Sequence, residues 1–295
     1  MNCPLASLNI QLINLYDLIT VITIITPVYN GDRFIESCLQ AVIQQNCSEV
    51  EHLIVDGGSS DRTIEIVQRY AQQYSQIRWI SEKDRGQSDA MNKGVTLAKG
   101  EIIGFLNVDD YYEPNVLNRV LELFQSLPQP SFVVGNCNVW NDAGELKKYN
   151  RPAKLRLTDL LLGAEVNPHP INPSAYFYHT ALHDAIGLYK VDEHFALDLD
   201  FILRAVQVAH VKHIDETWGN YREIEGTKTI LDWRSGEGAK RAQALLRTYR
   251  KQLPPHLQIQ VVMLYFLLNS PRQTVKWMKK GIGRTVRSLP KVLQT

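Results

Sequence analysis

Three polar residues after a short apolar run carry the strongest chemical signal in the sequence. Residues 102–106 (IIGFL) are apolar and follow Gly100, which predicts a buried central strand. Asn107, Asp109 and Asp110 come directly after it. Ligands of open α/β sheets collect outside the carboxyl ends of the strands, and oxygen side chains suit Mg²⁺ or Mn²⁺ held together with a diphosphate. Taken alone, the stretch fits equally well a polar loop in which Asp110 caps the next helix.

The composition is that of an ordinary globular protein. The chain has 295 residues, of which 44% are hydrophobic and 21% charged, and a formal net charge of +1. A net charge this small does not indicate a nucleic-acid-binding protein. Residues 5–22 are apolar but interrupted by polar residues, and no basic region precedes them, so we expect neither a signal peptide nor a membrane span there. No CxxC pair or zinc-binding spacing is present, which predicts reduced thiols in a cytoplasmic protein for Cys3, Cys38, Cys47 and Cys137.

Strand and helix signals alternate at short spacing in the first half of the chain. Apolar, largely β-branched runs predict strands over residues 21–26, 52–55, 77–80 and 102–106. Helical spacing of apolar residues follows the first, second and fourth runs, and a polar loop that leads into a helix ending at Gly100 follows the third. This alternation favours an α/β fold with a parallel or mostly parallel sheet flanked by helices. A further strand is expected over residues 172–178, and His210 and His213 are interpreted as strand residues without a metal.

Two common nucleotide-binding signatures are absent. The segment after the first strand, residues 26–31 (TPVYNG), contains neither the GxGxxG of dinucleotide-binding folds nor the GxxxxGK[ST] of P-loops. Acids follow two of the predicted strands instead, namely Asp56 and Asp109. One carboxylate can accept a hydrogen bond from a base N–H while another holds a metal on phosphates. The pair therefore predicts a site for a nucleoside diphosphate.

Four motifs, in this order, resemble those of family 2 glycosyltransferases. They are residues 26–30 (TPVYN), 55–61 (VDGGSSD), 84–94 (DRGQSDAMNKG) and 105–110 (FLNVDD). The resemblance covers about residues 20–225. It implies a GT-A-type fold and an inverting enzyme.

The resemblance also implies how a nucleotide-sugar donor, expected to be a UDP-sugar, is bound. Asp56 would read the base edge, Arg85 would lie along the diphosphate, and Asp109 would bind Mn²⁺ or Mg²⁺. Residues 218–229 resemble the family's loop that closes over the donor diphosphate; the alternative is a surface loop with solvated charges. The implied donor-binding residues are Pro27, Tyr29, Asp56, Arg85, Asp89, Asn107, Val108, Arg222 and Lys228.

A catalytic base is expected in a later segment. Residues 196–204 (ALDLDFILR) resemble the family segment that carries the base, which implies Asp198 as the base and Asp200 as a structural or helix-capping acid. Inversion by direct displacement requires a base that takes the proton from the acceptor hydroxyl. By spacing alone, Asp198 is more simply the N-cap of an apolar helix.

The sequence departs from the family pattern at two positions. Asn107 stands where the family has the first acid of its D-x-D motif, so Asp109 is the one strong metal ligand expected there. Gly57 stands where a second acid often follows Asp56, which leaves the ribose contact unassigned. His169, on the expected acceptor side, either contacts a sugar or is a loop histidine satisfied by the protein itself.

The sequence divides into an expected GT-A domain over residues 1–230 and a helical, basic amphipathic extension over residues 231–295. Residues 259–268 are apolar but too few to span a bilayer. The end of the chain fits an anionic membrane surface, or a helix docked on the domain or on a partner chain. No acid occurs after Ser270, and the basic residues there are Arg272, Lys276, Lys279, Lys280, Arg284, Arg287 and Lys291.

The sequence therefore predicts an inverting glycosyltransferase in the cytoplasm or on the inner face of the plasma membrane. The acceptor would be a hydroxyl of a saccharide or of a lipid-linked saccharide. One alternative is a sugar-phosphate nucleotidyltransferase. That class of enzyme needs a glycine-rich basic loop after the first strand, and residues 27–31 do not provide one. The other is a non-catalytic nucleotide-sugar binding protein, which would tolerate loss of Asp198.

Overall fold

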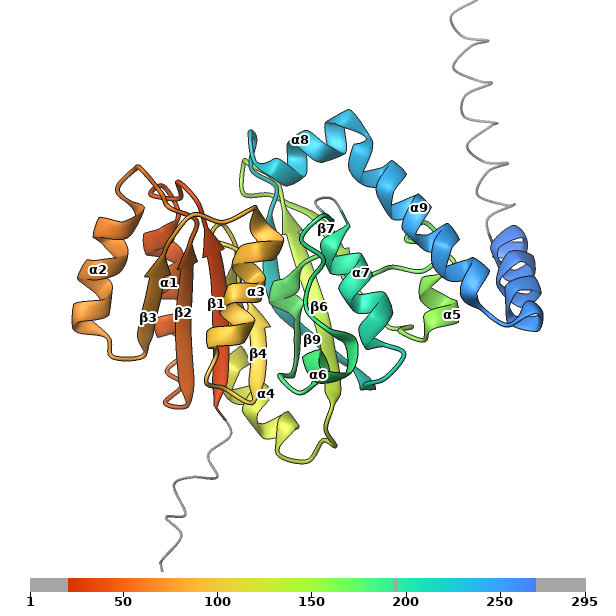
Figure 1. Cartoon of the computed structure of the whole chain (residues 1–295), viewed down its shortest axis with the longest axis horizontal. Helices are drawn as coiled ribbons and strands as arrows, with labels where there is room; N and C mark the ends of the chain where they lie inside the picture. Colours follow the sequence, from red (N-terminus) through yellow and green to blue (C-terminus); the bar gives the residue numbers. More distant parts are fainter. Residues whose placement is uncertain (1–20, 194–195, 269–295) are drawn as a thin grey trace, which may run out of the picture.

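The computed structural model of the chain describes residues 21–193 and 196–268. Nine strands of this part form a single sheet in the order β3-β2-β1-β4-β8-β6-β9-β5, with β7 paired to β6 (Figure 1). The strands are β1 (Ile22–Val28), β2 (Val50–Asp56), β3 (Ile77–Ser81), β4 (Ile102–Phe105), β5 (Tyr111–Tyr112), β6 (Ser131–Trp140), β7 (Leu146–Asn150), β8 (Tyr176–His179) and β9 (His210–Arg222).

The first half of the sheet is parallel and matches the four strands expected from the apolar runs. β1 pairs in parallel with both β2 and β4, and β2 pairs in parallel with β3. β1, β2 and β4 are buried on both faces, since alternate residues enter different core clusters, whereas β3 at the edge of the sheet is only partly buried. In β1, Ile25 joins the core on one face while Ile24 joins the core on the other. The carboxyl ends of β1, β2 and β4 thus meet along one edge, as predicted for a ligand site.

The second half mixes strand directions. β8 pairs antiparallel with β4 and β6, whereas β6 pairs in parallel with β9. The strand expected over residues 172–178 begins only at Tyr176, and Pro173–Ala175 forms a 3₁₀ turn instead. The reason is local: the side chain of Asn172 accepts a hydrogen bond from the Ser174 amide at 2.9 Å, which bends the chain before the strand. The position of His210 and His213 in β9 confirms their interpretation as strand residues.

Helices cover both faces of the sheet. α3 (Gln87–Leu97), α6 (Leu182–Ile186) and α7 (Leu197–Ala205) bury apolar residues in the larger core cluster on one face. α1 (Ile35–Ile43), α2 (Thr63–Gln73) and α4 (Val116–Phe124) cover the other face. The short α5 (Leu157–Leu160) follows β7 in the chain and lies near α9 (Figure 1). This arrangement confirms the α/β fold expected from the sequence.

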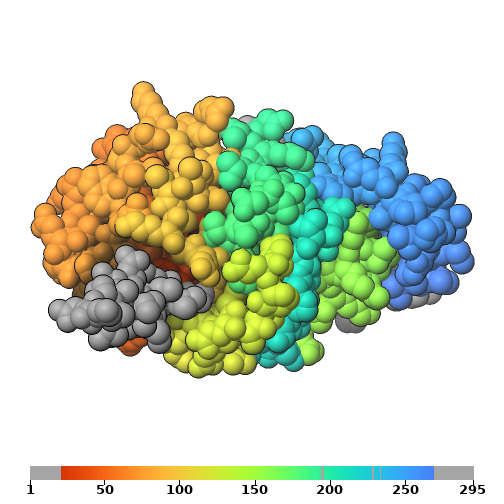
Figure 2. Space-filling model, turned by 60° about the horizontal axis from the view of Figure 1, so that its bottom comes forward, coloured from red at the N-terminus to blue at the C-terminus, as the bar shows by residue number. Residues whose placement is uncertain are grey.

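The C-terminal part packs on the domain through the helices α8 and α9 and through a third helical stretch. α8 (Lys228–Ser235) and α9 (Glu237–Gln252) are separated by Gly236, whose φ of 73° breaks the helix. The boundary expected at residue 230 therefore falls inside α8. Residues 255–268 are also helical. Leu246, Tyr249 and Val261 bury side chains in the core beside α7, at the end of the molecule opposite α2 (Figures 1 and 2).

The predictions for the chain's two ends concern mostly residues outside the described ranges. The basic residues 272–291, on which the membrane interpretation depends, lie outside the described residues, as does nearly all of the apolar stretch 5–22. Within the described ranges, no helix has the length and apolarity needed to cross a membrane. Cys38, Cys47 and Cys137 are buried free thiols, as expected, and burial raises the pKa of Cys38 to about 12.

Candidate functional site

A buried acid organises the loop that follows β4. Asp110 is 1% exposed and accepts three hydrogen bonds: from Asn107 Nδ2 at 3.0 Å, from Asn172 Nδ2 at 2.8 Å and from the Arg222 amide at 3.1 Å. Burial and the neighbouring Asp109 charge raise the pKa of Asp110. The loop after β4, the loop before β8 and the end of β9 therefore meet at one carboxylate. Asn172 was not expected in this site, although its place before Pro173 in a proline-rich loop marked it as a fixed, extended position.

Asp109 keeps part of its surface open beside this cluster. The Nε atom of Arg222 donates to the Asp109 carbonyl oxygen, and the guanidinium group also lies over the ring of Phe34, 5.6 Å from its centroid. Burial raises the pKa of Asp109, while the Arg222 charge lowers it. Arg222 is the last residue of β9, so the expected loop over residues 218–229 is wrong in its first five residues. Of these five residues, 219–222 pair with β6, and Trp218 is buried.

A divalent cation fits this donor set only in part. The described residues contain no group of three His, Cys, Asp or Glu side chains that could hold a metal ion. Asp109 supplies one carboxylate, and Asn107 supplies an amide oxygen that is 3.4 Å from Gln87 Nε2. Mg²⁺ and Mn²⁺ are commonly bound through one or two carboxylates with substrate phosphates and water completing the shell. The residues therefore fit a metal that arrives with a diphosphate.

Asp56 is more enclosed than its expected role suggests. Its side chain is 0% exposed at the end of β2. Oδ2 accepts hydrogen bonds from the amides of Gly58 and Ser59 and from the Ser81 hydroxyl, at 2.7–3.0 Å. Oδ1 accepts one from the Ser59 hydroxyl. Oδ1 therefore has the Ser59 hydroxyl as its one described hydrogen-bond partner, whereas Oδ2 has three.

Asp84 fills the space that a side chain at position 57 would occupy. A Cβ atom added to Gly57 would lie 2.5 Å from Asp84 Oδ2. Asp84 is half-buried, and its Oδ1 accepts a hydrogen bond from the Gly86 amide at 2.8 Å. A carboxylate from the loop between β3 and α3 therefore occupies the space into which a side chain at position 57 would project. Sequence spacing gave no signal for this, because positions 57 and 84 meet only through the pairing of β2 with β3.

The other expected donor residues occupy separate positions around the same edge of the sheet. Arg85 and Asp89 pair with each other, with Nη2 2.7 Å from Oδ1, and Arg85 is exposed. Pro27 lies near the end of β1, and Tyr29, just after it, is 66% exposed. Two further residues are Val108, which packs near Val28, and Lys228, which begins α8.

A cavity of about 370 Å³ brings the donor side of the site to α7. Its walls include Gln87 and Asn107 from the carboxyl edge of the sheet and Asp198 from the first turn of α7. The Tyr176 hydroxyl donates to Asp198 Oδ1 at 3.0 Å. Burial and the Asp198 charge raise the pKa of Tyr176 well above its usual value, so the hydroxyl keeps its proton. The alternative of a simple N-cap is wrong, since Ala196 holds the cap position.

Two other predicted residues have structural surroundings. Asp200 is 1% exposed and pairs with Lys190 at 2.7 Å and with Arg204 at 2.8 Å, which supports its interpretation as a structural acid. His169 is buried, and its Nε2 is 2.7 Å from the Leu160 carbonyl oxygen. Burial lowers the pKa of His169, so the ring is neutral near pH 7 and donates to that carbonyl. The protein itself thus supplies the hydrogen-bond partner of the His169 ring, as the interpretation of His169 as a loop histidine predicted.

Comparison with known proteins shows the family. The family model described as glycosyl transferase family 2 matches residues 23–184, which is more than half of the chain. A protein of Bacillus subtilis (strain 168) described as the uncharacterised glycosyltransferase EpsJ is 30% identical over 227 residues, covering 74% of this chain and 65% of that protein. The chondroitin synthase of Escherichia coli is 27% identical over 217 residues, covering 72% of this chain and 30% of the synthase.

A solved structure shows the same fold. The crystal structure of S. aureus TarS 1–349 in complex with UDP-GlcNAc superposes with a TM-score of 0.65 at 18% identity, covering 84% of this chain and 72% of that one. The chain therefore has the GT-A-like fold of TarS and belongs to glycosyl transferase family 2. The chain spans about two thirds of the length of EpsJ and about a third of the chondroitin synthase.

Proposed function

We propose that this chain transfers a sugar from a UDP-sugar to a hydroxyl group of a saccharide or lipid-linked saccharide, with inversion at the anomeric carbon. The observation that carries this proposal is the cavity in which Asn107, beside the acids of the β4 loop, faces the same space as Asp198. Family membership favours it over the nucleotidyltransferase alternative. The UDP-GlcNAc bound to TarS supports a UDP-sugar donor, and the relative named chondroitin synthase supports polysaccharide synthesis.

In the proposed reaction, Asp198 acts as general base. The proton of the acceptor hydroxyl passes to the Asp198 carboxylate, the acceptor oxygen bonds to the anomeric carbon, and the bond from that carbon to the diphosphate breaks. The diphosphate leaves with the electron pair. Tyr176 is a positioning residue, because its hydroxyl donates a hydrogen bond to Asp198 Oδ1 and so orients the carboxylate.

The donor would be held at the carboxyl edge of the sheet. Asp109 and Asn107 would hold Mn²⁺ or Mg²⁺, which when bound offsets the charge that grows on the departing diphosphate. Arg222, Arg85 and Lys228 would contact the phosphates as cations. Pro27, Tyr29, Val108 and Asp56 would hold the nucleoside, and Asp89 would orient Arg85 through their ion pair.

Asp84 supplies the acid for the ribose in this proposal. Its carboxylate lies in front of Gly57, where the expected second acid of the motif would project. A carboxylate there can accept hydrogen bonds from ribose hydroxyls next to a base bound at Asp56.

The C-terminal extension, residues 231–295, would attach the enzyme to an anionic membrane surface from the cytoplasmic side. The helical stretch 255–268 supports this, since it exposes apolar side chains at helical spacing before the basic residues 272–291 begin. The exposed residues on this face are Ile259, Val262, Met263, Phe266 and Leu267.

A transfer assay tests the proposal. The full chain is incubated with Mn²⁺, a panel of UDP-sugars and a panel of saccharide and glycolipid acceptors, and UDP release and the anomeric configuration of the product are measured. We expect an inverted product and a loss of about 10²–10⁴-fold in turnover for Asp198→Asn. The matched control is Asp192→Asn, which changes an exposed acid near the start of the same helix.

Three outcomes contradict the proposed function. A product with retained configuration excludes direct displacement with Asp198 as base. Full turnover in Asp198→Asn excludes Asp198 from the reaction. A chain that binds UDP-sugars tightly and turns none of them over is a binding protein, which is the non-catalytic alternative.

A further inference from the structure

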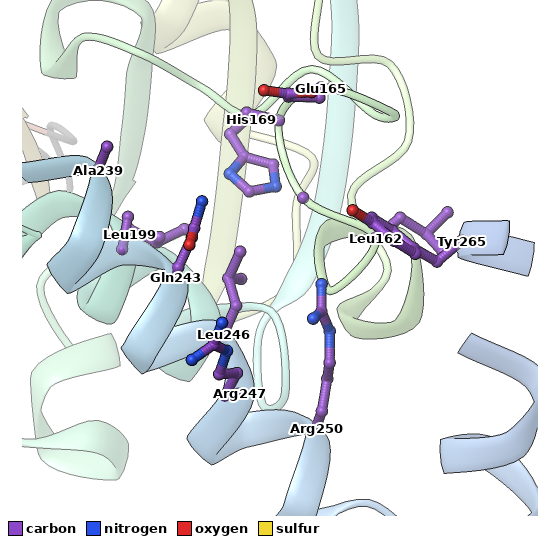
Figure 3. Close-up of a pocket in the computed structure, with 13 residues that line it drawn as sticks. Leu162, Glu165, His169, Leu199, Ala239, Gln243, Leu246, Arg247, Arg250 and Tyr265 are labelled. Carbon is purple, nitrogen blue, oxygen red and sulfur yellow. The ribbon is translucent and has the colours of Figure 1, made fainter. Parts of the chain in front are cut away.

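A second, larger cavity adjoins the cavity that contains Asp198. It has a volume of about 870 Å³ and lies between the loop of residues 162–169, the start of α7, α9 and the helical stretch 255–268 (Figure 3). The two cavities share Leu199, Ala239 and Ala242 as lining residues. A molecule that places a hydroxyl at Asp198 can therefore extend past α9 into the second cavity.

We call this second cavity the arginine pocket, since two arginines of α9 line it among apolar side chains. Figure 3 shows the side chain of Arg250 rising into the space next to Leu162 and Tyr265, with Arg247 one turn away. Its main lining residues for the argument are Leu162, Leu199, Leu246, Tyr265, Arg247 and Arg250.

The two arginines have no acidic partner within the described ranges of the chain. Arg250 is half-buried; its Nε donates to the Leu161 carbonyl at 2.7 Å, and its guanidinium carbon lies 5.7 Å from the centroid of the Tyr265 ring. Burial and the charge of Arg247 both lower the pKa of Arg250. A bound anion would relieve both effects, because it would solvate the half-buried cation and screen it from its neighbour.

The rest of the lining limits what the anion can be attached to. Glu165, the acidic residue of the lining, lies beside neutral His169 across the pocket from the arginines (Figure 3). Leu162, Leu199 and Leu246 give the remaining wall an apolar character. A free sugar chain would bury its hydroxyls against these leucines without partners, which is unfavourable. An apolar chain that carries an anionic group matches both parts of the lining.

We propose that the arginine pocket binds the phosphate and the adjoining apolar chain of a lipid-phosphate-linked acceptor. This inference rests on the proposed function, because it assigns the acceptor class to the site in which Asp198 acts. Arg250 and Arg247 bind the phosphate, the leucines and Tyr265 contact the first part of the chain, and the sugar hydroxyl reaches Asp198 past Leu199. Tyr265 belongs to the helical stretch 255–268, which also exposes an apolar face. The rest of the acceptor's lipid chain can therefore stay in the membrane.

A binding experiment with small probes tests this assignment. The full chain is titrated with farnesyl phosphate, with farnesol and with inorganic phosphate, below the concentration at which the lipids form micelles. We expect farnesyl phosphate to bind more tightly than either of the other two, since each of them offers only one part of the recognised group. We expect Arg247→Gln to weaken farnesyl phosphate binding by about tenfold, the usual effect of losing a hydrogen bond to a charged group. Arg250→Gln is expected to weaken it by at least as much.

Lys251→Gln is the matched control, because Lys251 is an exposed cation of the same helix that does not line the pocket. Equal binding of farnesol and farnesyl phosphate overturns the inference, and so does an Arg247→Gln variant that binds no more weakly than Lys251→Gln. Arg247 makes no hydrogen bond within the part of the chain described, so this variant is expected to fold even if Arg250→Gln, which loses the contact to Leu161, does not.

A parallel titration with UDP separates this inference from the proposed function. A chain that binds UDP but not farnesyl phosphate overturns the acceptor assignment alone. A chain that binds farnesyl phosphate in an Arg247-dependent manner but no UDP supports the pocket and contradicts the proposed donor.

Discussion

Replacing Ser59 by alanine tests how a nucleobase reaches the buried carboxylate of Asp56. In the structure the Ser59 hydroxyl donates to Asp56 Oδ1, the oxygen that accepts no other described hydrogen bond. The three donors on Oδ2 hold the carboxylate in place without it. If a base N–H binds at Oδ1, it must displace the Ser59 hydroxyl. Ser59→Ala removes this competitor and should therefore strengthen UDP binding.

The size of the effect follows from two opposing contributions. A hydrogen bond to a charged group is worth about 1.5–3 kcal/mol, and about 1.4 kcal/mol corresponds to a tenfold change in affinity. The Ser59 hydroxyl also accepts the Asn30 amide at 2.7 Å, and losing this contact loosens the loop that carries Tyr29. Asn30 is exposed, so water can replace the lost acceptor. We expect a net increase of about threefold to tenfold in UDP affinity.

Calorimetric titration of UDP in the presence of Mn²⁺ measures this change. Asp56→Asn should weaken UDP binding strongly, because an amide has one acceptor oxygen in place of two. Ser60→Ala is the matched control, since the Ser60 hydroxyl contacts Asn30 Oδ1 at 3.4 Å and not Asp56. A tenfold loss of UDP affinity in Ser59→Ala would refute the reasoning, because the hydroxyl would then be part of the binding site.

Three further predictions concern stability. Gly104 lies in the central strand β4, and Gly104→Ala should lower the free energy of unfolding by about 1–3 kcal/mol, because the new Cβ would lie 2.5 Å from the Phe177 ring. An unchanged midpoint in urea titration contradicts this. The control Gly238→Ala, whose Cβ would have nothing nearer than 3.9 Å, should be neutral or stabilising. Burial lowers the pKa of His52 to about 3 from 6.5, so as the pH falls the unfolded chain takes up the proton first. The free energy of unfolding should therefore fall by about 1.4 kcal/mol per pH unit between pH 6.5 and about pH 3. It should fall less steeply in His52→Gln. Asp200→Asn should cost about 3–5 kcal/mol, since it leaves two cations around a buried position; a loss under 1 kcal/mol in the same titration would show that the pairs contribute little.

The parallel half of the fold could be predicted because each of its strands carries its own signal. The apolar runs that contain Ile24, Leu53 and Ile103 are buried on both faces, so burial of each run needs no knowledge of its partners. The strands β5, β6 and β7 were not predicted. In β7, residues 146–149 are exposed, so this strand shows no apolar pattern and depends on its pairing with β6.

The candidate site was predictable where its residues are contiguous in sequence and not where distant loops meet. Asn107 and Asp109 follow one strand, so their shared edge of the sheet could be inferred. Asn172 reaches Asp110 across 62 positions, and Tyr176 reaches Asp198 across 22. Such contacts depend on the antiparallel entry of β8 next to β4, for which one sequence gives no local signal.

The central claim, a metal-assisted nucleoside diphosphate site at Asp109, is tested most directly by titrating UDP and GDP into the wild type and Asp109→Ala, with and without Mn²⁺. We expect that UDP binds more tightly than GDP, that Mn²⁺ strengthens the binding, and that Asp109→Ala removes the Mn²⁺ effect. Binding of neither nucleotide in the presence of Mn²⁺, or an undiminished Mn²⁺ effect in Asp109→Ala, would contradict it.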